Sequence, residues 1–206
     1  MNKWIIGARP RTLSAAITPV VAATALAYHQ NKTIDLINVV LALLVGIFLQ
    51  VGVNYSNDYS DGIKGTDSNR VGPMRLVGSG AASASQVKRA ALLTYFIGAC
   101  AGLILALRTS ILLTIVGAIA IVAAWTYTGS SKPYGYRGFG EISVFVFFGI
   151  VATNGTFYAE TKHFSGWAFL LSLTMGALAC ALLAINNLRD LPKDLGAGKR
   201  TLAVLL

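Results

Sequence analysis

The chain has 206 residues, of which 55% are hydrophobic and 12% charged, and its mean hydropathy is +0.64. Because soluble domains carry about 25% charged residues, this composition excludes a protein whose whole surface faces water. It also excludes a disordered chain, and a chain with only two cysteines is not a disulfide scaffold. The net charge of +9 suggests nucleic-acid binding in a soluble protein. In a membrane protein it reflects the gathering of cations on the cytoplasmic side, so we expect no nucleic-acid partner.

Six apolar stretches are long enough to cross a bilayer as helices, which takes about 20 residues. They cover roughly residues 12–28, 36–56, 90–107, 110–128, 141–159 and 166–187. The sequence therefore predicts an all-α, polytopic transmembrane helix bundle, with one domain over residues 1–206. A further apolar run begins at residues 201–206, which favours a chain truncated at its C-terminus.

The positive charges are distributed unequally between the two sides of this bundle. If the N-terminus is cytoplasmic, every Lys and Arg except Lys32, Arg108 and Lys162 lies on the cytoplasmic side. This asymmetry predicts the orientation of the bundle. It places the N-terminus and the three long loops, at 57–89, 129–140 and 188–200, on one cytoplasmic face.

Five of the eight carboxylates form two clusters at the cytoplasmic ends of the second and sixth stretches. The clusters with their amides contain Asn57, Asp58, Asp61 and Asp67, and Asn186, Asp190 and Asp194. If the helices continue through them, residues four apart share a face, and the like charges of Asp190 and Asp194 then repel. Arg189 and Lys193 are expected to point elsewhere on the helix, so a divalent metal would relieve this repulsion better.

The remaining acids fit ordinary structural roles. We interpret Asp35 and Glu160, in the short outer loops, as solvated charges, and Glu141 as a favourable charge at a helix start.

Carboxylate and amide oxygens without nearby His or Cys favour Mg²⁺, which binds one or two carboxylates together with phosphate oxygens. The sequence thus predicts a magnesium–diphosphate clamp; the alternative is that the acids only mark helix ends. Arg75, Lys132 and Lys199 lie in the same loops and are candidates for binding phosphate, or are ordinary cytoplasmic cations. Five tyrosines crowd the same face and are interfacial anchors or π faces that stabilise a cation: Tyr55, Tyr59, Tyr127, Tyr134 and Tyr136.

At this point the motifs resemble the UbiA superfamily of intramembrane prenyltransferases, over essentially the whole chain. The closest likeness is to the branch that prenylates 1,4-dihydroxy-2-naphthoate in menaquinone biosynthesis. It rests on the segments 9–13 (RPRTL), 57–61 (NDYSD), 72–75 (GPMR), 132–136 (KPYGY), 186–190 (NNLRD) and 198–202 (GKRTL). Many members have a third acid where this chain has Gly65, and here the acid is Asp67. The family has nine transmembrane helices, so the resemblance implies that six of nine are present.

The resemblance also implies a site and a reaction. Asp58, Asp61, Asp190 and Asp194 would be catalytic, and Mg²⁺ would be held by Asn57, Asp61, Asp190 and Asp194. The diphosphate would be bound by Arg9, Arg75, Lys132 and Lys199, with Asp67, Asn186 and Tyr134 in support. An all-trans-polyprenyl diphosphate would ionise, and the naphthoate ring would attack the allylic cation with loss of CO₂ and diphosphate. The partners implied are these two substrates and the lipid bilayer of a bacterial cytoplasmic membrane, with no obligate protein partner.

Three alternatives remain open at this stage. In the first, the acceptor is another aromatic compound such as 4-hydroxybenzoate or homogentisate, or a lipid alcohol. In the second, the chain is an ion-coupled transporter, although transporters place such acids near the bilayer midplane. The third alternative is a non-catalytic membrane scaffold.

Overall fold

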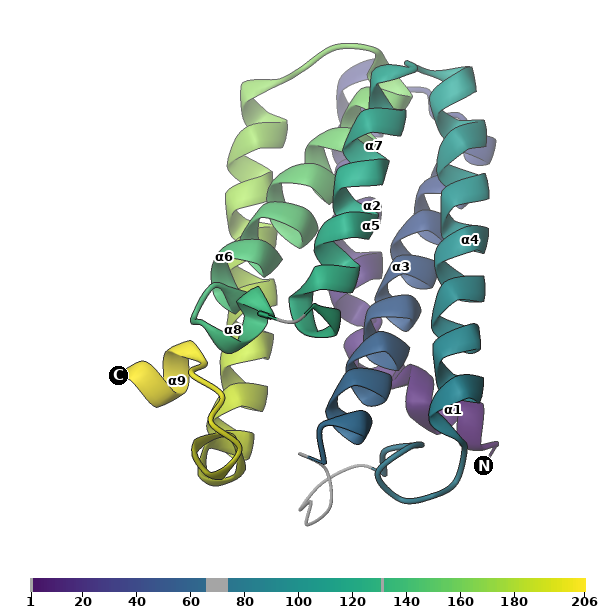
Figure 1. Ribbon diagram of the computed structural model, residues 1–206. Helices are drawn as coiled ribbons and strands as arrows, with labels where there is room; N and C mark the ends of the chain where they lie inside the picture. Colours follow the sequence, from purple (N-terminus) through teal and green to yellow (C-terminus); the bar gives the residue numbers. More distant parts are fainter. Residues whose placement is uncertain (1, 66–73, 131) are drawn as a thin grey trace.

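The computed structural model describes residues 2–65, 74–130 and 132–206, apart from the side chain of Lys193. The protein is 81% helical and has no strand in these described residues, which confirms the predicted all-α class. The α-helices are α1 (Lys3–Ala8), α2 (Ser14–Asn31), α3 (Leu36–Ile63), α4 (Ala84–Arg108), α5 (Leu112–Gly129), α6 (Gly140–Val144), α7 (Ala152–Thr161), α8 (Gly166–Gly196) and α9 (Leu202–Leu205) (Figure 1). Short 3₁₀ turns are η1 (Pro10–Thr12) and η2 (Tyr134–Tyr136), and η3 (Phe145–Val151) is a π-helix.

The expected membrane spans are present. Four are α3, α4, α5 and α8, and the fifth is continuous from α6 through η3 to α7. The sixth is a pair, residues 3–12 followed by α2, bent by 50°. The bend has a local cause, because Arg9 adopts a left-handed φ of 52° and Pro10 then starts the 3₁₀ turn.

Two helices extend well beyond their predicted apolar stretches. α3 continues to Ile63 and α8 to Gly196, so Asn57, Asp58 and Asp61 of the first motif and all of the second motif are helical. In the last two turns of α3, Asp58 and Ser60 are buried, and Asp58 is compensated by backbone hydrogen bonds from the following loop. The residues four apart in each motif therefore share a helix face, as the sequence predicts.

The helices pack in two groups. α3 packs extensively on α4, and α5 lies against both. The other group joins α2, α7 and α8, with η3 lying against α8. At that contact the backbones approach closely, since a Cβ on Gly149 would lie 2.6 Å from the Cα of Gly176.

The end of the bundle opposite the acidic motifs is held by a polar cluster. Asp35, interpreted as a solvated charge, is 42% exposed and also pairs with Arg108, and Glu160 is partly buried. Arg108 pairs with Asp35 at 2.7 Å and donates to Asn38 Oδ1 at 2.9 Å. Glu160 accepts a hydrogen bond from the backbone N–H of Asp35 at 2.7 Å. Although desolvation acts to raise it, the pKa of Asp35 is held below its usual value by Arg108 and by backbone N–H donors. These contacts connect the starts and ends of α3, α4 and α7.

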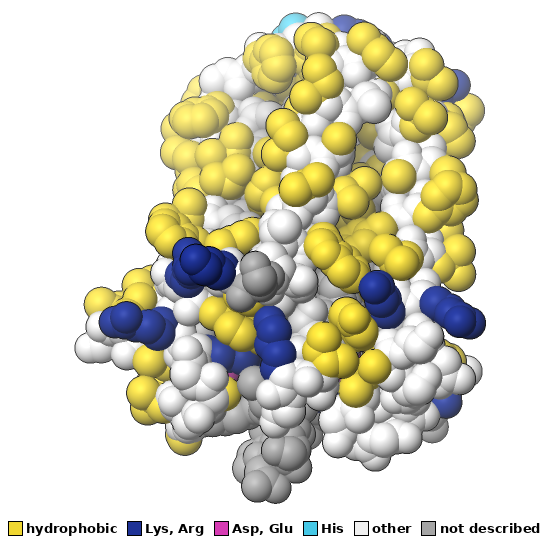
Figure 2. All heavy atoms as spheres, viewed as in Figure 1, with side chains coloured by type: hydrophobic (Ala, Val, Ile, Leu, Met, Phe, Trp, Pro, Cys, Tyr) yellow, Lys and Arg dark blue, Asp and Glu magenta, His cyan; other side chains and the backbone are white. Residues whose placement is uncertain are grey.

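Hydrophobic side chains cover most of the upper part of the molecule in Figure 2, and most visible Lys and Arg side chains lie lower down. Large apolar residues are strongly exposed, including Leu107 (71%), Trp167 (69%) and Phe96 (66%). Such exposure is unfavourable in water and ordinary in a lipid bilayer. The protein is a multi-pass membrane protein.

Candidate active site

The ends of α3 and α8 that carry the acidic motifs lie at the same end of the bundle as both chain termini (Figure 1). Asp61 is in the last turn of α3, and Asp194 is near the end of α8. Only 5% of the Asp61 side chain and 8% of the Asp194 side chain are exposed. Burial of two carboxylates is costly unless each is paired, so their partners decide what this site is.

Lys199 connects the two acidic helix ends. Its Nζ lies 3.0 Å from Asp61 Oδ2 and 4.0 Å from Asp194 Oδ1, and the side chain is 9% exposed. The chain returns to this position because Gly198 adopts a left-handed φ of 68° after α8 ends. The Lys199 N–H then donates to the Asp194 carbonyl at 2.9 Å. The structure thus places Lys199, a predicted phosphate-binding residue, between Asp61 and Asp194, which are predicted metal ligands from the two motifs.

Tyr136, in the loop between α5 and α6, completes this cluster and was not among the residues assigned from the sequence. Its hydroxyl donates a hydrogen bond to Asp61 Oδ1. The ammonium groups of Lys64 and Lys199 lie 4.8 and 4.6 Å from the centre of its ring. These are cation–π distances. The sequence signals for Tyr136 are its place in the 132–136 motif and among the tyrosines of the predicted cytoplasmic face.

Asn57 is held on the same side by the end of α5. Thr128 Oγ1 donates to Asn57 Oδ1 at 2.7 Å, and Lys64 Nζ donates to the Thr128 carbonyl at 2.9 Å. Desolvation and the nearby Lys199 charge lower the pKa of Lys64, although Asp61 acts to raise it. Lys64 and Thr128 are further residues of the site that the sequence did not single out.

Asp58 faces the loop that leads from α3 to α4. Its two carboxylate oxygens accept backbone hydrogen bonds from Leu76 and Val77 at 2.7 and 3.0 Å, and the residue is fully buried. This contact fixes the loop residues next to Arg75, which is itself 9% exposed. The structure therefore gives Asp58 a visible structural role, and its catalytic role stays a prediction.

On α8, the expectation that Arg189 points away from the acids is wrong. Its guanidinium makes a two-pronged contact with Asp190, at 2.8 and 3.0 Å, because the side chain folds back along the helix surface. Asn186 donates to the Leu182 carbonyl, one turn earlier. Metal binding by Asp190 and the supporting role of Asn186 stay predictions.

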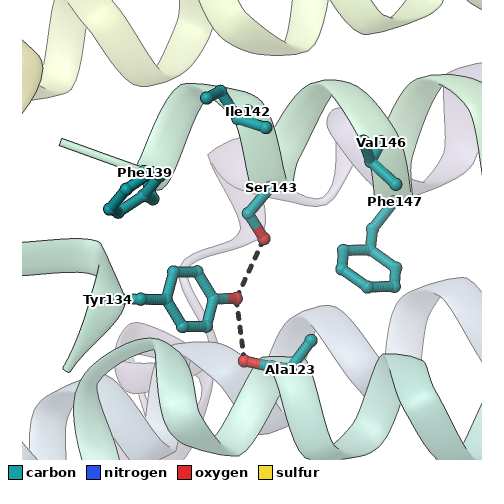
Figure 3. Close-up of a pocket in the computed structure, with 7 residues that line it drawn as sticks. All are labelled: Ala123, Tyr134, Phe139, Ile142, Ser143, Val146 and Phe147. Carbon is teal, nitrogen blue, oxygen red and sulfur yellow. Dashed lines mark hydrogen bonds between the residues drawn. The ribbon is translucent and has the colours of Figure 1, made fainter. Parts of the chain in front are cut away.

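The remaining predicted residues lie in different surroundings. Arg9 donates to the Asn54 carbonyl at 3.3 Å, and Lys132 is exposed. Tyr134 lines a pocket of about 260 Å³ between α5 and the α6–η3 span, where its hydroxyl donates to the Ala123 carbonyl at 2.8 Å (Figure 3). Its oxygen is also 2.9 Å from Ser143 Oγ. Asp67 lies outside the described residues.

The described parts of the chain contain no group of three or more His, Cys, Asp or Glu side chains arranged as a metal site. They do contain two buried carboxylates, Asp61 and Asp194, that converge on a single cation, the Lys199 ammonium. Mg²⁺ needs only one or two carboxylates when waters and phosphate oxygens complete its shell. The donor set therefore fits Mg²⁺ bound together with a diphosphate.

Comparisons with known proteins find similar chains over nearly the whole length of this one. The model of the UbiA prenyltransferase family matches residues 16–206. A 1,4-dihydroxy-2-naphthoate octaprenyltransferase of Mycobacterium tuberculosis is 52% identical over 204 residues, covering 99% of this chain and 70% of that protein. Enzymes of the same name from Haemophilus influenzae and Escherichia coli are 41% and 38% identical. These two alignments cover 100% and 98% of this chain, and 70% and 68% of the relatives.

Proposed function

The chain belongs to the UbiA prenyltransferase family, and from this premise we propose that it transfers a polyprenyl group to 1,4-dihydroxy-2-naphthoate. The donor is an all-trans-polyprenyl diphosphate, and the products are the quinol form of demethylmenaquinone, CO₂ and diphosphate. The observation that carries the proposal is the meeting of Asp61 and Asp194 around Lys199 at the basic end of an apolar bundle. Relatives named for this reaction align over nearly the whole chain, which supports naphthoate as the acceptor.

We assign the acids to a Mg²⁺ site formed by Asn57, Asp61, Asp190 and Asp194. Mg²⁺ bound there would act as a Lewis acid on the leaving diphosphate. Lys199 and Arg75 would bind the diphosphate oxygens, with Arg9 and Lys132 in the flanking loops. Asp58 would keep Arg75 in place through the α3–α4 loop, and Asp67 and Asn186 would support the acids.

The chain's own residues favour ionisation of the donor in a simple way. The allylic C–O bond breaks, and its electron pair leaves with the diphosphate, where Lys199 and Arg75 stabilise the added charge. Tyr136, beside Asp61 and Lys199, offers a π face suited to an allylic cation. The naphthoate ring then forms the new C–C bond, and loss of CO₂ restores the aromatic ring without a protein base.

The site lies where an amphiphilic donor meets both water and lipid. We place it at the cytoplasmic face of a bacterial cytoplasmic membrane, since nearly all Lys and Arg residues are at this end. The apolar pocket beside Tyr134 is suited to part of the isoprenoid chain.

The experiment is a prenyl-transfer assay on the purified chain in detergent or membranes, with naphthoate or 4-hydroxybenzoate as acceptor, and with Mg²⁺ or EDTA. We expect product with naphthoate and Mg²⁺ only. Asp61→Ala and Asp190→Ala should each lower turnover by at least about 100-fold, the usual size of such transition-state losses. Asp35→Ala, at the far end of the bundle, is the matched control.

Undiminished turnover in either acidic variant would contradict the clamp. Product with 4-hydroxybenzoate alone would reassign the acceptor. Metal-dependent ion uptake by proteoliposomes, without prenyl transfer, would favour the transporter alternative.

A further inference from the structure

The Lys199 ammonium occupies the space between the two carboxylates, Asp61 and Asp194, that we assign to the metal. It is buried, it is 3.0 Å from one carboxylate, and it is 4.0 Å from the other. A buried ion pair of this kind is expensive to break by removing one partner, because the other charge stays desolvated. A metal ion at the same carboxylates competes with the ammonium, since the two cations repel at this distance.

A second cation lies next to Lys199. The ammonium of Lys64 is 4.8 Å from the Tyr136 ring, and that of Lys199 is 4.6 Å from the same ring. The ring attracts both ammonium groups, but the two repel each other, and the charge of Lys199 contributes to the lowered pKa of Lys64. An anion placed between them would relieve this repulsion. Diphosphate carries several negative charges and is the anion that the proposed reaction brings to this site.

We propose that Lys199 is an exchangeable counter-ion of the active site. Its ammonium neutralises Asp61 and Asp194 before the metal binds, and it turns to the diphosphate, beside Lys64 and Tyr136, when the metal takes its place. This inference rests on the proposed function and deepens it. Its consequence is that metal and diphosphate must each strengthen the binding of the other by the same factor, because coupling between two sites is reciprocal.

The test measures binding rather than turnover. Free Mn²⁺ is followed by electron paramagnetic resonance in the presence of the purified chain, with and without inorganic pyrophosphate. After correction for the Mn²⁺ that pyrophosphate itself binds, we expect pyrophosphate to raise the Mn²⁺ affinity of the protein by at least about fivefold. In Lys199→Met, the affinity for Mn²⁺ alone should rise several-fold, and pyrophosphate should increase it by a clearly smaller factor than in the wild type, because only direct coordination by its oxygens remains.

Lys64→Met separates this mechanism from a general loss of positive charge. Lys64 lies where the diphosphate is proposed to bind, so its replacement by Met should reduce the effect of pyrophosphate. It should raise the affinity for Mn²⁺ alone less than Lys199→Met does. Lys88→Met removes an exposed lysine that lies 5.7 Å from the Tyr59 ring at the same end, and it should behave as the wild type. Lys199→Arg keeps the charge and should retain coupling.

The outcomes distinguish this inference from the function on which it rests. If the wild type shows coupled binding and Lys199→Met binds Mn²⁺ no more tightly, the exchange is wrong and the metal–diphosphate site stands. If the wild type, shown to be folded by gel filtration, binds neither Mn²⁺ nor pyrophosphate, both proposals fail.

Discussion

At the scale of single residues, the first acidic motif divides between two tasks. Asp61 faces α8 and pairs with Lys199, whereas Asp58, three residues earlier on α3, faces the loop that follows the helix. The Asp61 carboxylate therefore faces the proposed reaction site, whereas the Asp58 carboxylate binds the backbone N–H groups of Leu76 and Val77. Helical spacing puts Asp61 on the face of Asn57, but it does not show that Asp58 accepts hydrogen bonds from the following loop.

This division predicts different results for similar substitutions. Asp58→Ala leaves the buried N–H groups of Leu76 and Val77 without their acceptor, which costs about 1–3 kcal/mol for each such group. We expect Asp58→Ala to have a clearly lower melting temperature in detergent. Its Mn²⁺ binding should weaken only because part of the protein is unfolded. Asp58→Asn keeps one amide oxygen as an acceptor and should lose less stability.

Thermal unfolding followed by gel filtration measures this effect. Asp61→Asn is the comparison, since it should change Mn²⁺ binding at temperatures where the protein is still folded. A melting temperature of Asp58→Ala equal to that of the wild type would contradict the structural role of this carboxylate.

At the scale of elements, the π-helix η3 packs closely against α8. Gly149 is the closest point, where an added Cβ would lie 2.6 Å from Gly176 Cα and 2.7 Å from the Ser172 carbonyl. Both neighbours are backbone atoms, so a side chain there must push the helices apart. π-Helical segments are rare in proteins and occur frequently at functional sites. Here the segment also supplies Val146 and Phe147 to the pocket beside Tyr134 (Figure 3).

We therefore predict that Gly149→Ala destabilises the protein by about 1–3 kcal/mol, as overpacking of a tight contact does. The matched control is Gly155→Ala in α7, where an added Cβ meets nothing within 4 Å. It should leave stability unchanged or raise it slightly, because Ala is the better helix former. The measurement is the melting temperature of both variants in the same detergent. Equal melting temperatures would show that η3 and α8 are not in close contact.

The elements also show how far the sequence alone leads. The length and hydropathy of the apolar stretches predict the six spans, and the four-residue spacing of Asn57 and Asp61 is realised because α3 remains helical. The contact of Lys199 with Asp61 joins residues 138 positions apart, so no local pattern encodes it. Arg189 was misplaced because helical spacing describes Cβ directions, whereas a long guanidinium stem reaches the adjacent Asp190.

At the scale of the whole molecule, charge and contacts divide the bundle into two unlike ends. One end carries the acidic motifs, Lys199 and most of the cations, and it is the proposed site of reaction. The other is held by the cluster of Asp35, Asn38 and Arg108, which connects the starts and ends of neighbouring spans. Between them lies an apolar surface without such charge, as a bilayer requires.

This asymmetry predicts the orientation of the protein, because cations are retained on the cytoplasmic side during insertion. In a background of Cys100→Ser and Cys180→Ser, single cysteines are introduced at Thr33 and Ser79, which are exposed at opposite ends of the bundle. We expect a membrane-impermeant maleimide to label Thr33→Cys in intact spheroplasts, and Ser79→Cys only after permeabilisation. Each variant is the control for the other, since both thiols are in exposed polar loops. The reverse pattern would place the acidic site outside the cell, away from a cytoplasmic supply of polyprenyl diphosphate.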